Sequence, residues 1–152
     1  MIICITGSVS TGKTTLAKKI ASKIKGKYID VNKIITKYKL SEGYDKKRKS
    51  KIVDIKKLNK VLIDLIKKSK NLVIDSHLSH YLPKKYVDLC IVTKCNLKIL
   101  KKRLEKRGYD KDKIRENLDA EIFDVCLNEA KEKGHKIKII NTTKFKQSLK
   151  YI

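Results

Sequence analysis

Short apolar runs alternate along the chain with segments in which apolar residues recur at every third or fourth position. The runs predict buried strands, and the wider spacing predicts amphipathic helices. We expect strands at residues 2–6, 28–31, 72–75, 89–93 and 136–141. Strands that alternate with helices from end to end are typical of an α/β fold with a largely parallel sheet.

Each helical segment carries an apolar stripe that we expect to face the core. The stripes consist of Leu16, Ile20 and Ile24; Ile55, Leu58, Leu62 and Leu65; Leu97, Leu100 and Leu104; and Ile114, Leu118, Ile122 and Val125. The last set predicts one longer helix. The only proline, Pro83, lies between the third and fourth strands, where a loop is needed.

Two charged segments, residues 39–51 and 107–111, lack such a stripe. The first is a polar excursion between two predicted helices and contains the basic run 46–49, and the second breaks the chain before a helix. Two interpretations are open. These segments are ordinary surface loops, or they are the mobile covers of a phosphotransferase, which close over two substrates and expel water.

Residues 7–14, with the sequence GSVSTGKT, match the phosphate-binding pattern G-x-x-x-x-G-K-[ST]. They follow the first strand and open the first helix, so the N–H groups of the turn can converge on a polyphosphate at the positive end of the helix dipole. In such a turn Lys13 reaches the β- and γ-phosphates, and the Thr14 hydroxyl can ligate Mg²⁺. The motif predicts nucleotide binding.

The chain has 152 residues, 41% of them hydrophobic, which suits one domain and is too little for two. No stretch approaches the roughly 18 apolar residues of a membrane span, and residues 2–6 are too short for a signal peptide. We therefore expect a cytoplasmic protein with no membrane contact. The cysteines form no C-x-x-C pair and are expected to be small buried hydrophobes, not zinc ligands or disulfides: Cys4, Cys90, Cys95 and Cys126.

The formal net charge is +23, from 39 Lys and Arg against 16 Asp and Glu. Such an excess creates a positive field that attracts polyanions, including nucleic acid and free nucleotides. The lysines are spread along every helix, however, as expected if they only solvate the surface. Charge alone leaves both interpretations open.

The third predicted strand ends in Asp75, and His77 follows two residues later. A carboxylate at the end of a strand beside the phosphate turn matches the Walker B arrangement, which holds Mg²⁺ directly or through water. His77 could orient a water, orient a phosphate oxygen or transfer a proton, although a loop histidine can also be structural. Arg103 and Arg107 share one helix face and Arg115 follows; guanidinium groups suit a transferring phosphoryl group or simply solvate a helix.

Several segments together resemble the adenylate kinase isoenzyme six family of archaea and eukaryotes. They are residues 7–15, 43–45, 75–77, 82–83, 107–109, 116–117, 121–123 and 129–130. The resemblance implies a P-loop nucleoside monophosphate kinase fold, with one α/β domain over residues 1–152 and a five-stranded parallel sheet flanked by helices. It also implies a monophosphate-binding segment at about 30–53 and a lid at about 107–117.

The activity implied by the resemblance is reversible phosphoryl transfer between ATP and a nucleoside monophosphate, preferentially AMP, with Mg²⁺ as cofactor and two ADP as products. ATP hydrolysis is implied as well. For the family, hydrolysis assists late maturation of the small ribosomal subunit and its 16S rRNA, through transient contact with a platform ribosomal protein.

The resemblance also implies roles for individual residues at matching positions. The residues expected to bind the ATP phosphates are Ser10, Gly12, Lys13, Thr14, Thr15 and the lid residue Arg107. The residues expected to act in catalysis are Lys13, Asp75 and His77, and the last two are implied especially in hydrolysis. The residues expected to bind Mg²⁺ are Thr14 and Asp75.

The chain departs from its apparent relatives at two places. Ser10 occupies a position where many carry glycine, which removes an easy route to positive φ. The monophosphate segment is strongly basic after Asp45 and lacks an obvious arginine at the usual place. Two other functions stay in view: a nucleotide-dependent factor that binds ribosomal RNA or protein, which the +23 charge motivates, and a small-metabolite kinase on the same scaffold. No Asn-Lys-x-Asp motif supports a GTPase.

Overall fold

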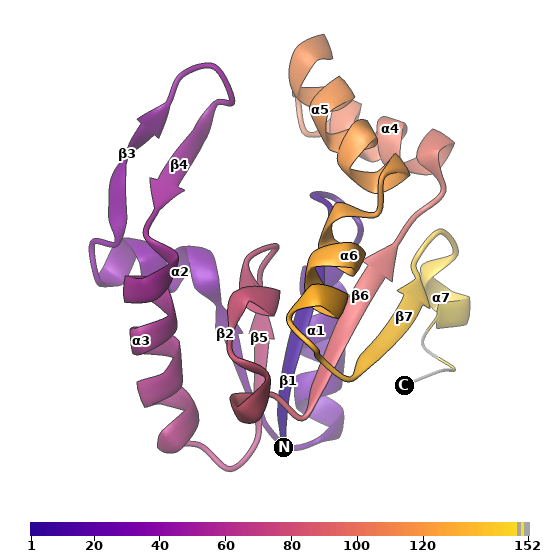
Figure 1. The fold of residues 1–152 in the computed structure, drawn as a ribbon. Coiled ribbons are helices and arrows are strands. Elements are labelled where there is room, and N and C mark those ends of the chain that lie inside the picture. The colour runs from indigo at the N-terminus through magenta and orange to yellow at the C-terminus, as the bar shows by residue number, and fades with distance from the viewer. Residues whose placement is uncertain (149, 151–152) are drawn as a thin grey trace.

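The computed structural model describes residues 1–148 and 150 (Figure 1). Its main sheet has five parallel strands in the order β2-β5-β1-β6-β7. In chain order they are β1 (Ile2–Gly7), β2 (Lys27–Asp30), β5 (Leu72–Asp75), β6 (Leu89–Lys94) and β7 (Ile137–Asn141). All five lie within a residue of the predicted positions, so the predicted five-stranded parallel sheet is confirmed.

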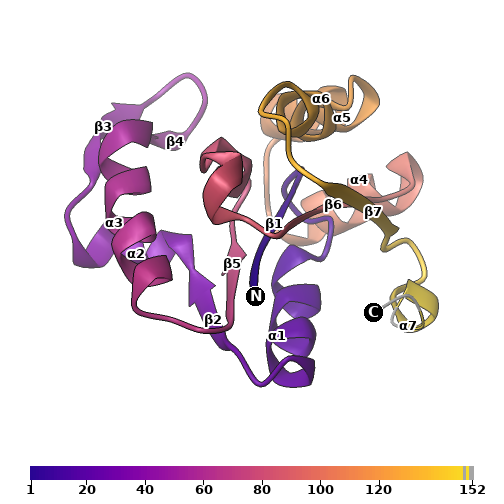
Figure 2. The ribbon, with the colours of Figure 1, turned by 60° about the horizontal axis from the view of Figure 1, so that its bottom comes forward.

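Helices cover both faces of this sheet. They are α1 (Lys13–Lys23), α2 (Val31–Lys37), α3 (Ile55–Lys67), α4 (Leu97–Lys106), α5 (Lys111–Ile122), α6 (Val125–Glu132) and α7 (Phe145–Ser148), with 3₁₀ turns η1 (Ser79–Tyr81) and η2 (Lys84–Tyr86). Figure 2 shows α1 and α7 on one side of the sheet and α6 on the other.

The central strand β1 supplies both halves of the core, because successive side chains point to opposite faces. Ile3 and Ile5 pack with Leu16 of α1. Cys4 packs on the other face, in the cluster that holds Leu58 of α3. Burial on both faces explains why this strand is apolar at almost every position.

A two-stranded antiparallel hairpin, β3 (Ser41–Asp45) and β4 (Ser50–Val53), stands apart from the main sheet (Figure 1). The sequence predicts only a polar excursion here. The alternation that marks a half-buried strand is missing because most side chains of the hairpin are exposed, including Tyr44 and Ile52 at 58% and 49%. Local cross-strand pairing, not burial, defines these strands.

The predicted long helix over residues 114–125 is wrong, because the chain breaks between α5 and α6. Asp124 adopts a left-handed conformation with φ 52°. Ile122 and Val125 are 48% and 39% exposed, so they do not belong to the core stripe, and neither does Leu97 of α4 at 42%. The helical spacing of apolar residues runs on from α5 into α6, so the sequence pattern does not show the break between them.

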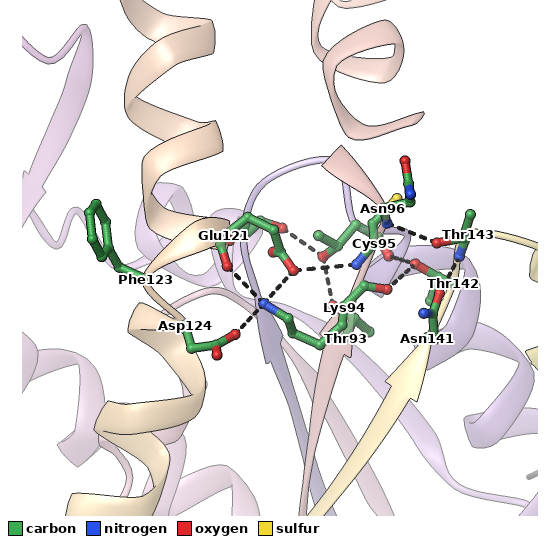
Figure 3. A network of polar contacts seen from close by, with 12 residues as sticks. Thr93, Lys94, Cys95, Asn96, Glu121, Phe123, Asp124, Asn141, Thr142 and Thr143 are labelled. Carbon is green, nitrogen blue, oxygen red and sulfur yellow. Dashed lines mark hydrogen bonds and ion pairs between the residues drawn. The ribbon is translucent and has the colours of Figure 1, made fainter. Parts of the chain in front are cut away.

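A polar network around Lys94 holds this break in place (Figure 3). The Lys94 ammonium at the end of β6 pairs with the Glu121 carboxylate at 2.5 Å and with Asp124, and it donates to the Glu121 carbonyl at 2.9 Å. The backbone N–H of Cys95 also donates to Glu121. Partial burial lowers the pKa of Lys94, but Asp124 and Glu121 outweigh that effect and raise it.

All four cysteines are free; Cys4, Cys90 and Cys95 are buried, as predicted, and Cys126 is half-buried. Within residues 1–148 and 150, no group of three or more His, Cys, Asp and Glu side chains is placed to hold a metal ion. Over the same residues, every helix is too short or too polar to cross a membrane.

We predict that Lys94→Met lowers the free energy of unfolding by about 3 kcal/mol, because it leaves the buried Glu121 carboxylate without its cation. Urea denaturation measures the change. Lys98→Met, an exposed lysine on α4, is the matched control and should cost less than about 0.5 kcal/mol. Equal effects of the two variants would show that the network does not stabilise the fold.

Candidate active site

A cleft of about 1320 Å³ opens at the carboxyl end of the main sheet. Its walls are the turn after β1, the end of β5, the α4–α5 region with the start of α6, and the tip of the β3–β4 hairpin. In Figure 1 the hairpin stands on the left and α5 on the right, both beyond the carboxyl ends of the sheet strands. All the residues that the family resemblance assigned to ATP, magnesium or catalysis line this cleft: Ser10, Gly12, Lys13, Thr14, Thr15, Asp75, His77 and Arg107.

The turn after β1 ends in an unobstructed helix N-terminus. Gly12 precedes α1 with φ 82°, and no side chain caps the helix. The first amides of α1 therefore remain available to an anion. The Lys13 ammonium lies across the turn and donates to the carbonyls of Gly7 at 2.9 Å and Ser8 at 2.8 Å.

Burial lowers the pKa of Lys13 to about 8, even though Cys126 and Asp75 act in the opposite direction. The charged form of this side chain is therefore less favourable here than in water. An anion placed within the turn would reverse that preference, because opposite charge favours the ammonium.

Hydroxyl groups hold the turn against the neighbouring strands. Gly7 has φ 142°, and a Cβ there would lie 2.2 Å from Thr93 Oγ1, so only glycine fits this approach to β6. Thr11 is buried and shares a 2.6 Å hydrogen bond with Thr93. Thr142, after β7, donates to the carbonyl of Thr11. Thr93 and Thr142 were missed because nothing in their local sequence marks them.

Asp75 ends β5 beside the first turn of α1. One of its oxygens, Oδ2, accepts hydrogen bonds from Thr14 Oγ1 at 2.6 Å and from the Tyr28 hydroxyl at 2.9 Å. A carboxylate and a hydroxyl this close together are hard oxygen donors of the kind that Mg²⁺ takes. The pair that the sequence assigned to magnesium therefore fits the ion, and Tyr28 is a neighbour that the sequence did not indicate.

His77 lies in the lining of the cleft, where its surface is exposed. The surrounding protein removes part of its hydration, and Lys13 adds positive charge; together they lower the pKa of His77 to about 4. The imidazole is therefore neutral near pH 7.

His80 is a structural residue. It is 1% exposed, and its ring joins three elements by contacting Thr6 of β1 and Glu129 of α6, each at 2.7 Å. Burial lowers the pKa of His80, although Glu129 opposes the change.

Two of the three candidate arginines reach the turn. Arg107 donates to Ser10 Oγ at 3.2 Å and lies over the Tyr109 ring. Arg103 donates to the carbonyls of Ser10 at 3.4 Å and Thr142 at 2.9 Å. Arg115 instead pairs with Asp119 on the exposed face of α5, outside the cleft lining, which fits a residue that solvates its helix.

Ser10 adopts the left-handed conformation with φ 65° even though it is not glycine. We predict that Ser10→Gly raises the free energy of unfolding by up to about 1 kcal/mol, because glycine adopts this conformation without strain. The exposed Arg107 contact that is lost contributes little. Ser10→Ala removes the same hydroxyl but keeps the strain, so it should not stabilise. Thermal unfolding of both variants tests this, and stabilisation by alanine would contradict it.

Comparison with known proteins gives the class first. Shikimate kinase from Acinetobacter baumannii, solved in complex with shikimate, superposes with a TM-score of 0.68 over 99% of this chain and 89% of that one, at 13% identity. At that identity the likeness shows the fold alone, which is that of the P-loop kinases. Residues 3–124 also match the family described as an AAA domain.

Closer relatives identify the family. A Methanocaldococcus jannaschii protein named "Putative adenylate kinase" is 42% identical over 141 residues, which cover 93% of this chain and 78% of that protein. The adenylate kinase isoenzyme 6 homolog of Dictyostelium discoideum is 40% identical over 129 residues, or 85% of this chain and 73% of that protein. The chain belongs to the AAA-domain family and to the adenylate kinase isoenzyme 6 family, which confirms the resemblance drawn from its motifs.

Proposed function

We propose that this protein is a nucleoside monophosphate kinase that transfers the γ-phosphoryl group of ATP to AMP. The observation that carries the proposal is that one cleft is lined both by Lys13, Asp75 and Arg107 and by the basic tip of the hairpin. The relatives named adenylate kinase support the same activity. In the reaction, the bond from the γ-phosphorus to the bridging oxygen breaks, and a bond to an acceptor phosphate oxygen forms.

The residues at the turn would position the ATP phosphates and neutralise their charge. Lys13, now bonded to two carbonyls, would donate to phosphate oxygens, and the free amides of α1 would do the same. Arg107 lies over the turn from the lid side. Thr14 and Asp75 would hold Mg²⁺, which neutralises charge on the β- and γ-phosphates when it is bound.

The acceptor side of the proposed site is the segment 30–53, and the proposed lid is 107–117, both within one kinase domain over residues 1–152. The two meet across the cleft, because Lys49 pairs with Asp110 and Lys113 donates to the Arg48 carbonyl at 2.5 Å. Arg48 and Lys49 line the cleft at the hairpin tip, and they would supply positive charge for a second phosphate once their pairings with Asp45 and Asp110 open. These contacts support covers that close over two substrates and exclude water.

We further propose that the protein hydrolyses ATP when no acceptor is bound. His77 is neutral near pH 7 and lies in the cleft lining two residues after Asp75. A neutral imidazole can orient a water molecule by accepting a hydrogen bond from it. That capacity, together with the family resemblance, supports hydrolysis as a second activity of the same cleft.

We predict that Lys13→Met lowers both ADP formation from ATP and AMP, and phosphate release from ATP alone, by about 10²- to 10³-fold. The fold should persist, because the variant removes an ammonium whose charge burial disfavours. Coupled assays with ATP and each nucleoside monophosphate in turn separate transfer from hydrolysis and identify the acceptor.

Lys23→Met is the matched control, since this exposed lysine lies on the same helix outside the cleft lining. It should keep the rates of the unchanged protein. Full turnover by folded Lys13→Met would remove the basis of the kinase assignment. Phosphorylation of a small metabolite in place of every nucleotide would favour the small-metabolite kinase.

The ribosomal role is also a proposal: assistance in maturation of the small subunit and its 16S rRNA through a platform ribosomal protein. The resemblance and the +23 charge support it, since Lys-rich surfaces gain affinity for RNA by counterion release. We predict that the protein binds a purified small-subunit platform protein with an affinity that differs between ATP and ADP.

Fluorescence anisotropy with each nucleotide, repeated with a 16S rRNA fragment and at increasing salt, measures this binding. If the affinity is the same with ATP and ADP and falls steeply as salt increases, the interaction is general electrostatic attraction. Strong nucleotide-dependent binding without AMP-dependent turnover would instead favour the alternative of an assembly factor that is not a kinase.

A further inference from the structure

Two hydroxyl groups from different elements converge on one oxygen of Asp75. Thr14 donates to Oδ2 from the first turn of α1 at 2.6 Å, and Tyr28 donates to the same atom from β2 at 2.9 Å. We infer that Tyr28 is a positioning residue that orients the Asp75 carboxylate for magnesium. The inference rests on the proposed function and deepens it at the same site.

The position of Tyr28 follows from the parallel pairing of β2 with β5. Tyr28 pairs in register with Val73, and Asp30 pairs with Asp75. The Tyr28 ring therefore lies two residues short of the carboxylate and extends along the strand to reach it. The ring is half-buried and packs against the cluster that holds Leu16 and Ile20, so the hydroxyl is held on a rigid support.

The Thr14 contact alone would not fix the carboxylate. Thr14 is exposed on the surface of the cleft, and its hydroxyl has one proton, which it gives to Asp75, and lone pairs that can face a cation. A carboxylate held by one donor can still rotate. A second donor on a different element fixes its plane, and because both donors use Oδ2 they leave Oδ1 unobstructed by these contacts.

Asp75 itself is only 6% exposed, so its carboxylate depends on protein hydrogen bonds more than on water. Hydrogen bonds to a charged group at low exposure are stronger than those between neutral groups in water. The Tyr28 hydroxyl thus helps to fix the direction of the carboxylate. A tyrosine that served only to fill the core would need neither the hydroxyl nor its contact with Oδ2.

The test is Tyr28→Phe, which keeps the ring and removes the hydroxyl. Isothermal titration calorimetry with ADP, in Mg²⁺ and again in EDTA, gives the gain in affinity that the ion supplies. We expect the affinity in EDTA to stay within about twofold, and the gain from Mg²⁺ to fall about 10-fold. Tyr86→Phe is the matched control: a half-buried tyrosine outside the cleft lining that should change neither value.

A double-mutant cycle separates positioning from packing. In the Asp75→Asn background, Tyr28→Phe should have no further effect on the gain from Mg²⁺, because Tyr28 acts through Asp75. An unchanged gain in Tyr28→Phe alone, or an equal loss in both backgrounds, overturns the inference. A Tyr28→Phe protein that fails to fold also overturns it, since it assigns Tyr28 to the core. Failure of the unchanged protein to bind ADP in either condition instead overturns the proposed function.

Discussion

The close approach of β1 to β6 at Gly7 is the constraint on which the rest of the cleft depends. No side chain fits there, so the chain can turn at the carboxyl end of the sheet and enter α1 with an N-terminus that no side chain caps. Thr93 and Thr142 fix the turn through neutral hydroxyl contacts to Thr11. Neutral contacts hold the backbone without bringing negative charge to a site that must receive an anion.

The α5–α6 side of the cleft is held by a buried ion pair at its base, and its tip meets the β3–β4 hairpin through an exposed ion pair. At the base of α5 and α6, the partly buried Lys94 pairs with the fully buried Glu121 (Figure 3). The tips meet through Lys49 and Asp110, both largely exposed to water. Exposed ion pairs contribute little to stability, so the tips can separate at small cost while the bases stay in place.

Local sequence signals predicted the features that depend on short stretches of chain. The strand at Leu72–Asp75 and the motif around Lys13 could be identified because burial on both faces and a tight turn each impose a pattern within a few residues. The β3–β4 hairpin was missed because its side chains face water and carry no burial pattern. The break at Asp124 was missed because its cause, Lys94, lies far away along the chain.

The sequence by itself determined the α/β architecture, the phosphate-binding turn and the family, since each follows from residues close together or from motifs in fixed order. Only the tertiary structure decided which side chains share one site. It brought Tyr28 to Asp75 and Arg103 to Ser10, and it left Arg115 on the outer face of its helix. The physical reason is that parallel strands and packed helices juxtapose residues many positions apart, and no local pattern records such a contact.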